Sequence, residues 1–244
     1  MYFDFMTMKT KLYSLAKLLL GDDEKKWVLA EKTAKLFNKK AILGEYNKIW
    51  LIDHEFVEEA RLLPCNNRQL ERLYVIKQIA EYCSSIEGDF AECGTYLGSS
   101  AFFMSKQSSK KIFLFDSWEG LSQPAIQDGT YWKKGDLGSE LSQVKSNLRQ
   151  FDNVVYLKGW IPSRFNEVSD RTFSFVHIDV DIYEPTKDSI GFFWERLTPG
   201  GILICDDYGF VNCPGAKKAM DDFFSGVSKI ISLPTGQGMV IKGL

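Results

Sequence analysis

From Gly88 onward, short apolar segments alternate with segments of helical pattern, and this alternation constrains the fold more than any other feature. The expected strands are residues 89–93, 111–115, 154–157, 173–178 and 201–205, followed by 230–233 and 239–241 on either side of a glycine-containing turn. Strands that alternate with helices form a mostly parallel sheet covered on both faces. Two strands joined by a short glycine turn are antiparallel neighbours. The sequence therefore predicts an α/β fold with a mostly parallel, seven-stranded sheet and an antiparallel terminal strand.

The segments before Gly88 carry only helical patterns, such as residues 27–37 and 68–83, and Asp53 and Asn67 stand where helix caps are expected. We therefore expect a helical N-terminal cap region, residues 1–85, and a core domain, residues 86–244. Between the strands, the expected helices are 98–106, 141–149, 187–197 and 216–224.

Charge and composition exclude several classes of protein. A net charge of −2 gives no basic surface for nucleic acid. The apolar segment 12–20 is too short to span a bilayer, and its spacing favours a docked amphipathic helix over a membrane-surface helix. The five cysteines include no C-x-x-C pair, and Cys83, Cys93 and Cys205 lie in apolar runs, which predicts reduced thiols and a cytoplasmic location.

Carboxylates or glycines follow all five of the expected parallel strands, at the sheet edge where ligands bind in such folds. These strand ends are Glu92 to Gly94, Asp116-Ser117, Gly159-Trp160, Asp179 to Asp181, and Asp206-Asp207.

The first of these ends continues through Tyr96, Gly98 and Ser99 into a helix. Glycines let the backbone approach a ligand closely, and a helix N-terminus attracts a carboxylate or a phosphate. Because Tyr96 stands where a dinucleotide motif has its middle glycine, the spacing is not G-x-G-x-x-G. A cofactor turn and a plain tight turn both remain open here.

Two further strand ends suit an adenosine group. Asp116 can accept both ribose hydroxyls, a device that NAD enzymes and methyltransferases share. Trp160 can stack on adenine, although a tryptophan packed in the core has the same sequence signature.

The last two ends gather four aspartates if their strands are neighbours, namely Asp179, Asp181, Asp206 and Asp207. Like charges so close are costly unless a cation joins them, and Mg²⁺ prefers oxygen ligands. Alternation along a strand sends Asp179 and Asp181 to opposite sides, so we expect Asp181 to face away from the metal. Helix capping is the alternative role for these acids. His177, just before the strand end, is expected to be buried and hydrogen-bonded.

The chain resembles the macrocin O-methyltransferase family in four stretches that keep the family's order. They are Gly88-Asp89-Phe90-Ala91-Glu92-Cys93-Gly94, Leu114-Phe115-Asp116-Ser117-Trp118-Glu119-Gly120-Leu121, His177-Ile178-Asp179-Val180-Asp181-Ile182-Tyr183-Glu184, and Asp206-Asp207-Tyr208-Gly209 with Gly215-Ala216-Lys217-Lys218-Ala219. The resemblance covers the chain from about residue 60 onward. It implies a Rossmann-like class I methyltransferase fold and the use of S-adenosylmethionine and Mg²⁺ to methylate sugar hydroxyls of small molecules. A homodimer is a further expectation at the family level.

The resemblance also implies residue roles. Asp179, Asp206 and Asp207 would hold the metal, and Asp179 would be the first choice of general base with Asp181 the second. Glu92, Gly94, Asp116 and Ser117 would bind the cofactor, and strand-end placement adds Tyr96, Gly98, Ser99, Gly159, Trp160 and Asp179. The family's glycine turn usually reads Trp-Arg-Gly-Gly, whereas this chain has Tyr96-Leu97-Gly98-Ser99, so the anchor of the cofactor's carboxylate is left open.

The favoured function is therefore a metal-assisted, S-adenosylmethionine-dependent O-methyltransferase that acts on a sugar-containing acceptor. The irregular stretch 117–139 predicts a lid, in which Trp118, Tyr131 and Trp132 would stack on a sugar or pack the lid itself. The alternatives are a nucleotide-dependent oxidoreductase and a non-catalytic cofactor-binding assembly subunit. The missing G-x-G-x-x-G and the terminal strand pair argue against the first, and the cluster of aspartates argues against the second.

Overall fold

The computed structural model describes residues 23–39, 43, 48–64 and 69–243, and the chain divides into two compact units, Met1–Val57 and Glu58–Leu244. The first unit contains helix α2 (Asp23–Phe37), helix α3 (Ile49–Ile52) and the start of α4 (His54–Leu62). The backbone N–H of Phe56 donates to Oδ1 of Asp53 over 3.1 Å, which confirms the predicted cap. The expected helix at 12–20 and the expected cap Asn67 lie outside the described residues.

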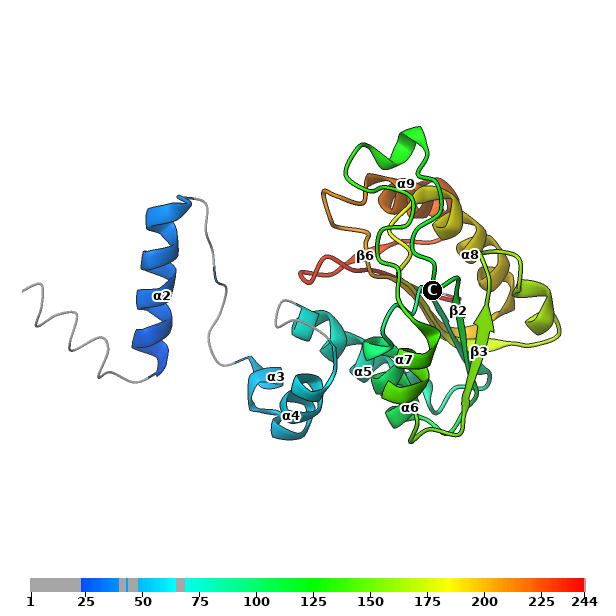
Figure 1. Cartoon of the computed structure of the whole chain (residues 1–244), viewed down its shortest axis with the longest axis horizontal. Helices are drawn as coiled ribbons and strands as arrows, with labels where there is room; N and C mark the ends of the chain where they lie inside the picture. Colours follow the sequence, from blue (N-terminus) through cyan, green and yellow to red (C-terminus); the bar gives the residue numbers. More distant parts are fainter. Residues whose placement is uncertain (1–22, 40–42, 44–47, 65–68, 244) are drawn as a thin grey trace, which may run out of the picture. The chain divides into compact units, whose positions relative to one another are not determined.

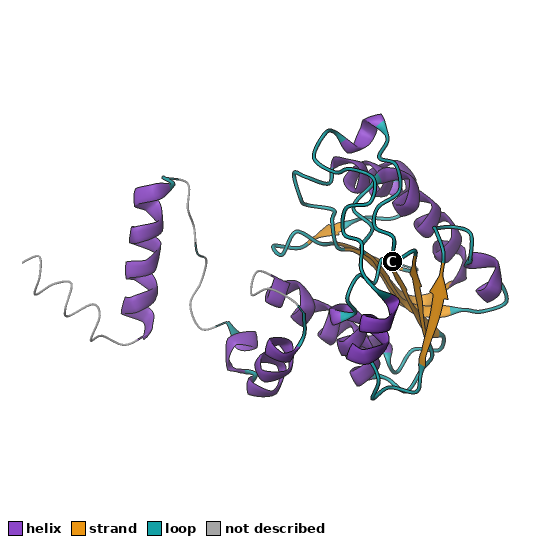
Figure 2. Ribbon diagram, in the orientation of Figure 1, coloured by secondary structure: helices purple, strands orange, loops and turns teal. Residues whose placement is uncertain are grey.

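The second unit is built on a seven-stranded sheet of order β3-β2-β1-β4-β5-β7-β6 (Figures 1 and 2). Its strands are β1 (Asp89–Cys93), β2 (Ile112–Asp116), β3 (Val154–Lys158), β4 (Phe173–Ile178), β5 (Leu197–Cys205), β6 (Ile231–Ser232) and β7 (Gly238–Ile241). The first five strands are parallel, whereas β7 pairs antiparallel with both β5 and β6. The predicted fold class is thus confirmed.

Helices cover both faces of this sheet (Figure 1). Helix α5 (Leu70–Cys83) packs with α6 (Ser99–Gln107), and α8 (Tyr183–Arg196) packs with α9 (Pro214–Phe224). Helix α7 (Leu141–Asn147) and the short 3₁₀ helices η2 (Ile126–Asp128) and η3 (Phe165–Val168) lie in the connections. Helix α5 belongs to the unit that holds the sheet, although the sequence grouped it with the N-terminal region.

The core explains why the central strands are so regular. All six residues of β4 are buried, as expected for a parallel strand with helices on both sides. Phenylalanine rings meet edge to face between helix α8 and the sheet: Phe165 and Phe173 each contact Phe193, with ring centroids 5.1 and 5.0 Å apart.

Backbone hydrogen bonds bring three of those strand ends into line. The N–H of Gly94 donates to Phe115, that of Asp179 to Cys93, and that of Asp206 to Ile178, over 2.9, 2.8 and 2.8 Å. Gly94, Asp179 and Asp206 therefore lie side by side at one edge of the sheet. Within the described ranges, no helix combines the length and the apolar character that crossing a bilayer requires.

Candidate active site

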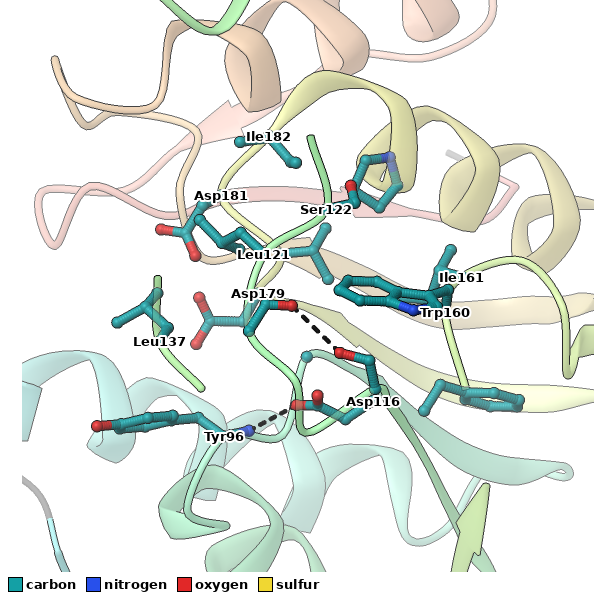
Figure 3. A pocket seen from close by; sticks show the side chains of 16 residues that line it. Tyr96, Asp116, Leu121, Ser122, Leu137, Trp160, Ile161, Asp179, Asp181 and Ile182 are labelled. Atoms are coloured by element: carbon teal, nitrogen blue, oxygen red, sulfur yellow. Dashed lines mark hydrogen bonds between the residues drawn. The ribbon is translucent and has the colours of Figure 1, made fainter. Parts of the chain in front are cut away.

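A pocket of about 580 Å³ opens at the carboxyl ends of β1, β2 and β4 (Figure 3). Seven of the residues predicted from the sequence line it: Gly94, Tyr96, Asp116, Ser117, Trp160, Asp179 and Asp181. Its other lining residues are Phe115, Gly120, Leu121, Ser122, Leu137, Ile161, Val180, Ile182 and Pro185. The strand ends that looked separate in the sequence thus enclose one space.

Gly94 lets two strand ends meet beneath this pocket. Its φ is +82°, and a Cβ at this position would stand 1.8 Å from the carbonyl oxygen of Asp179. No side chain fits at such a distance, so only glycine allows the end of β1 to pass under the end of β4.

Asp116 holds the turn after β1 and also faces the pocket. Its Oδ2 accepts the backbone N–H groups of Thr95 and Tyr96 over 2.8 and 2.9 Å, and its Oδ1 accepts that of Trp118 over 2.6 Å. Burial raises the pKa of Asp116, and these three hydrogen bonds oppose the rise. The carboxylate is therefore oriented by the backbone, with lone pairs left for hydroxyl groups in the pocket.

The wall beside Asp116 is apolar. Trp160 is 37% exposed and lines the pocket, so it is not a core tryptophan. Leu121 and Ile161 lie near it in Figure 3. A flat aromatic group could lie against this wall while a diol reaches Asp116.

Asp181 lies in the same pocket as Asp179, contrary to the expected alternation. Strand β4 ends at Ile178, and Asp181 has a left-handed backbone with φ of +60°. Alternation no longer applies beyond the strand, and the turn brings both carboxylates to one side (Figure 3).

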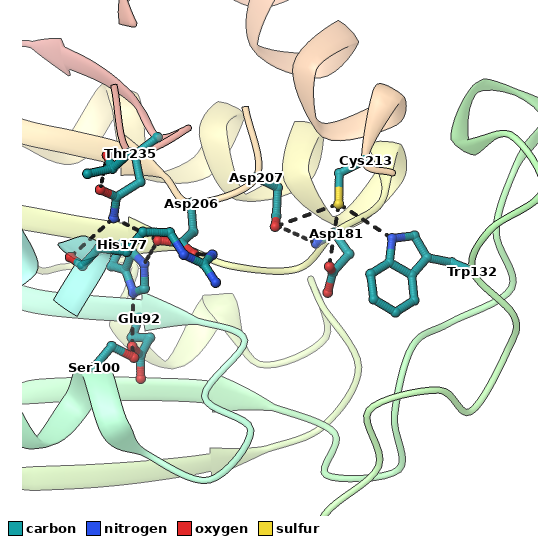
Figure 4. A network of polar contacts seen from close by, with 11 residues as sticks. Glu92, Ser100, Trp132, His177, Asp181, Asp206, Asp207, Cys213 and Thr235 are labelled. Atoms are coloured by element: carbon teal, nitrogen blue, oxygen red, sulfur yellow. Dashed lines mark hydrogen bonds and ion pairs between the residues drawn. The ribbon is translucent and has the colours of Figure 1, made fainter. Parts of the chain in front are cut away.

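The acidic side chains form two groups, each with ligand atoms within 4.8 Å of one another. One group is His177, Asp179 and Asp206. The other is Asp181, Asp207 and Cys213, which Figure 4 shows. The Oδ2 of Asp207 accepts the backbone N–H of Asp181 over 2.9 Å. Asp206 and Asp207, adjacent in sequence and predicted to share one metal, thus belong to different groups in this structure.

Burial and mutual repulsion perturb these acids. Burial, followed by the charge of Asp179, raises the pKa of Asp181 to about 8. Burial and the neighbouring aspartates likewise raise the pKa values of Asp179 and Asp207. For Asp206, burial acts in the same direction, but contacts with His177 and Arg72 outweigh it and lower the pKa. The raised pKa values reflect burial and also repulsion among these carboxylates, and a cation bound among them would relieve that repulsion.

Glu92 and His177 lie beneath the site and are almost fully buried. The hydroxyl of Ser100 donates to Oε1 of Glu92, and Nδ1 of His177 lies 2.9 Å from the same oxygen. His177 is thus buried and hydrogen-bonded, as expected. Glu92 does not line the pocket, and its contacts give it a structural position below the predicted cofactor residues.

The aromatic residues of the loop 117–139 differ in their solvent exposure and contacts. Trp118 is 4% exposed and packs near Tyr156, so it is part of the core. The indole Nε1 of Trp132 donates to Sγ of Cys213 over 3.4 Å. Tyr131 packs edge to face on Trp132, with ring centroids 4.8 Å apart, and is 58% exposed.

Sequence reasoning missed Arg72, on α5, whose guanidinium forms an ion pair with Asp206. Arg72 lines a second pocket of about 490 Å³, together with Ser99, which was predicted, and with Tyr96 and Asp179, which also line the first pocket. Asp206 also lines the second pocket, and the predicted residues that line neither pocket are Glu92, Gly98, Gly159 and Asp207. The only signal for Arg72 was a basic residue among the apolar positions of a predicted helix.

Comparison with known proteins gives a consistent result. The family model described as Macrocin-O-methyltransferase (TylF) matches residues 66–231, which is more than half of the chain. A tetracenomycin-C rhamnosyl 4'-O-methyltransferase of Streptomyces olivaceus is 27% identical over 184 residues, covering 65% of this chain and 69% of that protein. The demethyldecarbamoylnovobiocin O-methyltransferase of Streptomyces niveus is 25% identical over 192 residues, covering 69% and 72%.

Solved structures share the fold. The O-methyltransferase NovP superposes with a TM-score of 0.58 at 22% identity, covering 71% of this chain and 80% of its own. The calicheamicin methyltransferase CalS11 superposes with a TM-score of 0.65 at 16% identity, covering 84% and 96%.

Proposed function

Because the chain belongs to the macrocin O-methyltransferase family, we propose that it transfers a methyl group from S-adenosylmethionine to a hydroxyl of a sugar-containing small molecule, assisted by a divalent cation such as Mg²⁺. One observation carries this proposal: a single pocket joins Asp116, an acid suited to a ribose, with the carboxylates Asp179 and Asp181.

The adenosine part of the cofactor fits the Asp116 side of the pocket. Asp116 would accept the ribose hydroxyls, and the wall of Leu121, Trp160 and Ile161 would cover the adenine ring. The sulfonium would then face the end of β4, where the negative charge of Asp179 stabilises a positive group.

Asp181 is the residue that we favour as general base. A hydroxyl must lose its proton when it accepts a methyl group, and a base works best with a pKa near the working pH. Burial and the charge of Asp179 raise the pKa of Asp181 to about 8. Asp179 is the second candidate, because it lines the same pocket but also lies beside Asp206.

The donor set fits a hard cation. Asp179, Asp206 and Asp207 offer carboxylate oxygens at the ends of neighbouring strands, and oxygen is the ligand that Mg²⁺ prefers. A bound divalent cation supplies a Lewis acid that lowers the pKa of a coordinated hydroxyl. Asp206 lies in one group with Asp179, whereas Asp207 lies in the other with Asp181, so an ion held by all three predicted ligands requires these side chains to rearrange.

The proposed class of acceptor rests on the relatives, whose names describe methylation of a rhamnosyl derivative of tetracenomycin and of a novobiocin precursor. In this chain, the exposed Tyr131 of the loop 117–139 could stack on a sugar face. Acceptor choice would then depend on this loop.

A methyl-transfer screen tests the proposal. Purified protein is incubated with S-adenosylmethionine and a panel of glycosides and nucleotide sugars, in Mg²⁺ or in EDTA, and S-adenosylhomocysteine formation is measured. We expect turnover that requires the cation. Asp181→Asn should lower turnover by roughly 100-fold or more, and Asp206→Asn should abolish the response to Mg²⁺.

Asp222→Asn is the matched control, because Asp222 is an exposed aspartate on α9 that pairs with Lys218. Turnover that survives both EDTA and Asp206→Asn would remove the cation from the mechanism. A protein that fails to bind S-adenosylhomocysteine would contradict the proposed cofactor itself.

A further inference from the structure

The second pocket lies beside the first, at the junction of α5, α6 and the ends of β4 and β5. Tyr96 and Asp179 line both pockets, so a ligand with its adenosine on Asp116 can extend past these two residues into the second space. Of its lining residues, Tyr96, Ser99 and Asp179 were predicted to bind the cofactor and Asp206 to bind the metal, whereas Arg72 was given no role.

A single cation faces the pocket from α5. The guanidinium of Arg72 forms its ion pair with Asp206 and lies 4.9 Å from the centre of the Phe210 ring. Among the described residues, Asp206 is the one hydrogen-bond acceptor that the guanidinium contacts. Because a guanidinium has several N–H donors in one plane, Arg72 keeps donors for a second carboxylate.

The opposite wall also favours an anion. The N-terminus of α6 points its free N–H groups toward this space, and its first turn contains no acidic residue. Thr95 lines the pocket and is only 3% exposed, and its buried hydroxyl has no hydrogen-bond partner within the part of the chain that the structure describes. A buried hydroxyl without a partner is costly, so a ligand atom that reaches it would relieve that cost.

We propose that this pocket holds the amino-acid end of S-adenosylmethionine and that Arg72 binds its carboxylate, with Thr95 and the N-terminus of α6 on the other side. This inference rests on the proposed function. Arg72 would thus supply the anchor for the cofactor's carboxylate, which the glycine turn lacks because Leu97 replaces the family's usual arginine.

Electrostatics explain why a cation is needed at this position. A carboxylate in the pocket would lie near Asp179 and Asp206, both of which line it, and like charges repel strongly where water is excluded. The guanidinium of Arg72, already against Asp206, can stand between the two negative groups. The ligand's ammonium group gains from the same aspartates that its carboxylate must avoid.

Two ligands separate the role of Arg72 from that of the rest of the site. S-Adenosylhomocysteine carries the amino-acid end, whereas 5′-methylthioadenosine has the same adenosine and thioether but lacks it. Calorimetry in EDTA, which removes any effect of the metal, measures both affinities for the wild type, Arg72→Gln and Arg72→Lys.

Arg72→Gln should weaken S-adenosylhomocysteine binding by roughly 10- to 100-fold while the affinity for 5′-methylthioadenosine stays unchanged. Arg72→Lys, which keeps the charge, should recover part of the loss. Arg149→Gln, which changes an exposed arginine after α7, should alter neither affinity.

Several outcomes would overturn the assignment. An equal loss for both ligands would mean that Arg72 only supports the fold of the site, and no loss for either would mean that the carboxylate binds elsewhere. Wild-type protein that binds neither ligand would refute the proposed function and this inference together. If Arg72→Gln does not fold, Arg72→Lys is compared with the wild type instead. The ratio of the affinity for S-adenosylhomocysteine to that for 5′-methylthioadenosine should then be lower in Arg72→Lys, and the same ratio in both proteins would contradict the proposal.

Discussion

Oδ1 of Asp128 accepts a hydrogen bond from the backbone N–H of Tyr183 over 2.7 Å, and this contact fastens the loop 117–139 to the first turn of α8. The other oxygen, Oδ2, accepts the backbone N–H of Ala125 over 2.7 Å. Asp128 is 2% exposed, so a single buried carboxylate holds the loop beside the residues that follow Asp181.

Gly215 leaves room for that carboxylate. A Cβ at this position would stand 1.8 Å from Oδ1 of Asp128, so Gly215→Ala must displace the Asp128 carboxylate. We expect Gly215→Ala to destabilise the protein by about 1 to 3 kcal/mol in urea unfolding and to speed protease cleavage within the loop. Gly191→Ala is the control, because Gly191 lies in α8 with no heavy atom within 4 Å of the added carbon. It should stabilise the protein by up to about 1 kcal/mol. Equal unfolding midpoints for the two variants would show that the Asp128 carboxylate does not hold the loop in place.

Glu92 allows a test of the buried hydrogen bonds that join it to Ser100 and His177. Glu92→Gln keeps the side chain's size but removes the charge that faces His177 and Ser100. Breaking one side of a buried ionic pair should cost about 3 kcal/mol of unfolding free energy. Glu87→Gln, an exposed position one residue before Gly88, provides the control in the same urea titration. A stable Glu92→Gln variant with lowered cofactor affinity would instead support the direct cofactor role predicted from the sequence.

The pH dependence of stability should report on His177. Burial alone would lower its pKa, but contacts with Asp206 and Glu92 outweigh burial and raise the pKa to about 10 from an ordinary value of 6.5. A pKa raised by folding stabilises the protein fully below pH 6.5, and this contribution is lost as the pH rises toward 10.

Unfolding free energies measured in EDTA between pH 6.5 and 9.5 should therefore fall with rising pH, and His177→Gln should flatten the slope. Asp179, Asp181 and Asp207, whose pKa values are also raised, act in the same direction and are present in both proteins, so the slope that remains in His177→Gln reports on these acids. Identical slopes for the two proteins would mean that His177 does not hold an extra proton in the folded state.

Asp116 should control cofactor affinity. In Asp116→Asn the amide nitrogen cannot accept the backbone N–H groups of Thr95 and Tyr96, so the turn loosens and one acceptor for the ribose is lost. Affinity for S-adenosylhomocysteine and for 5′-methylthioadenosine should fall together, by roughly 10- to 100-fold. Asp152→Asn, an exposed aspartate before β3, should leave both affinities unchanged in the same calorimetric titrations. If only the affinity for S-adenosylhomocysteine falls, Asp116 does not bind the ribose.

The sequence was a good guide to the sheet because each strand is a short apolar run bounded by polar residues. The predicted range 173–178 is that of β4. Asp116 at the end of β2 shares a pocket with Asp179 after β4, and Asp179 lies close to Asp206 after β5, because parallel strands end at one edge. These relationships depend only on the order of the strands and on where each run stops.

Asp181 and Arg72 were beyond sequence reasoning for different physical reasons. The alternation rule gave the wrong side for Asp181 because the strand ends three residues earlier and the backbone turns at Asp181 with φ of +60°. The neighbouring residues Val180 and Ile182 do not predict this local geometry. Arg72 stands 134 residues from Asp206 in the chain. Their contact depends on how α5 packs against the sheet, which no local pattern specifies.

Gln237, which immediately precedes β7, is fully buried and donates its side-chain amide to Oδ1 of Asp206 over 2.7 Å. Because β7 pairs with β5 and with the edge strand β6, Asp206 has this partner only while β7 is part of the sheet. The acidic edge thus depends on the last strand of the chain as well as on the parallel strands. A change that loosens β7 should therefore weaken ligand binding at Asp206 without altering any residue that lines the two pockets.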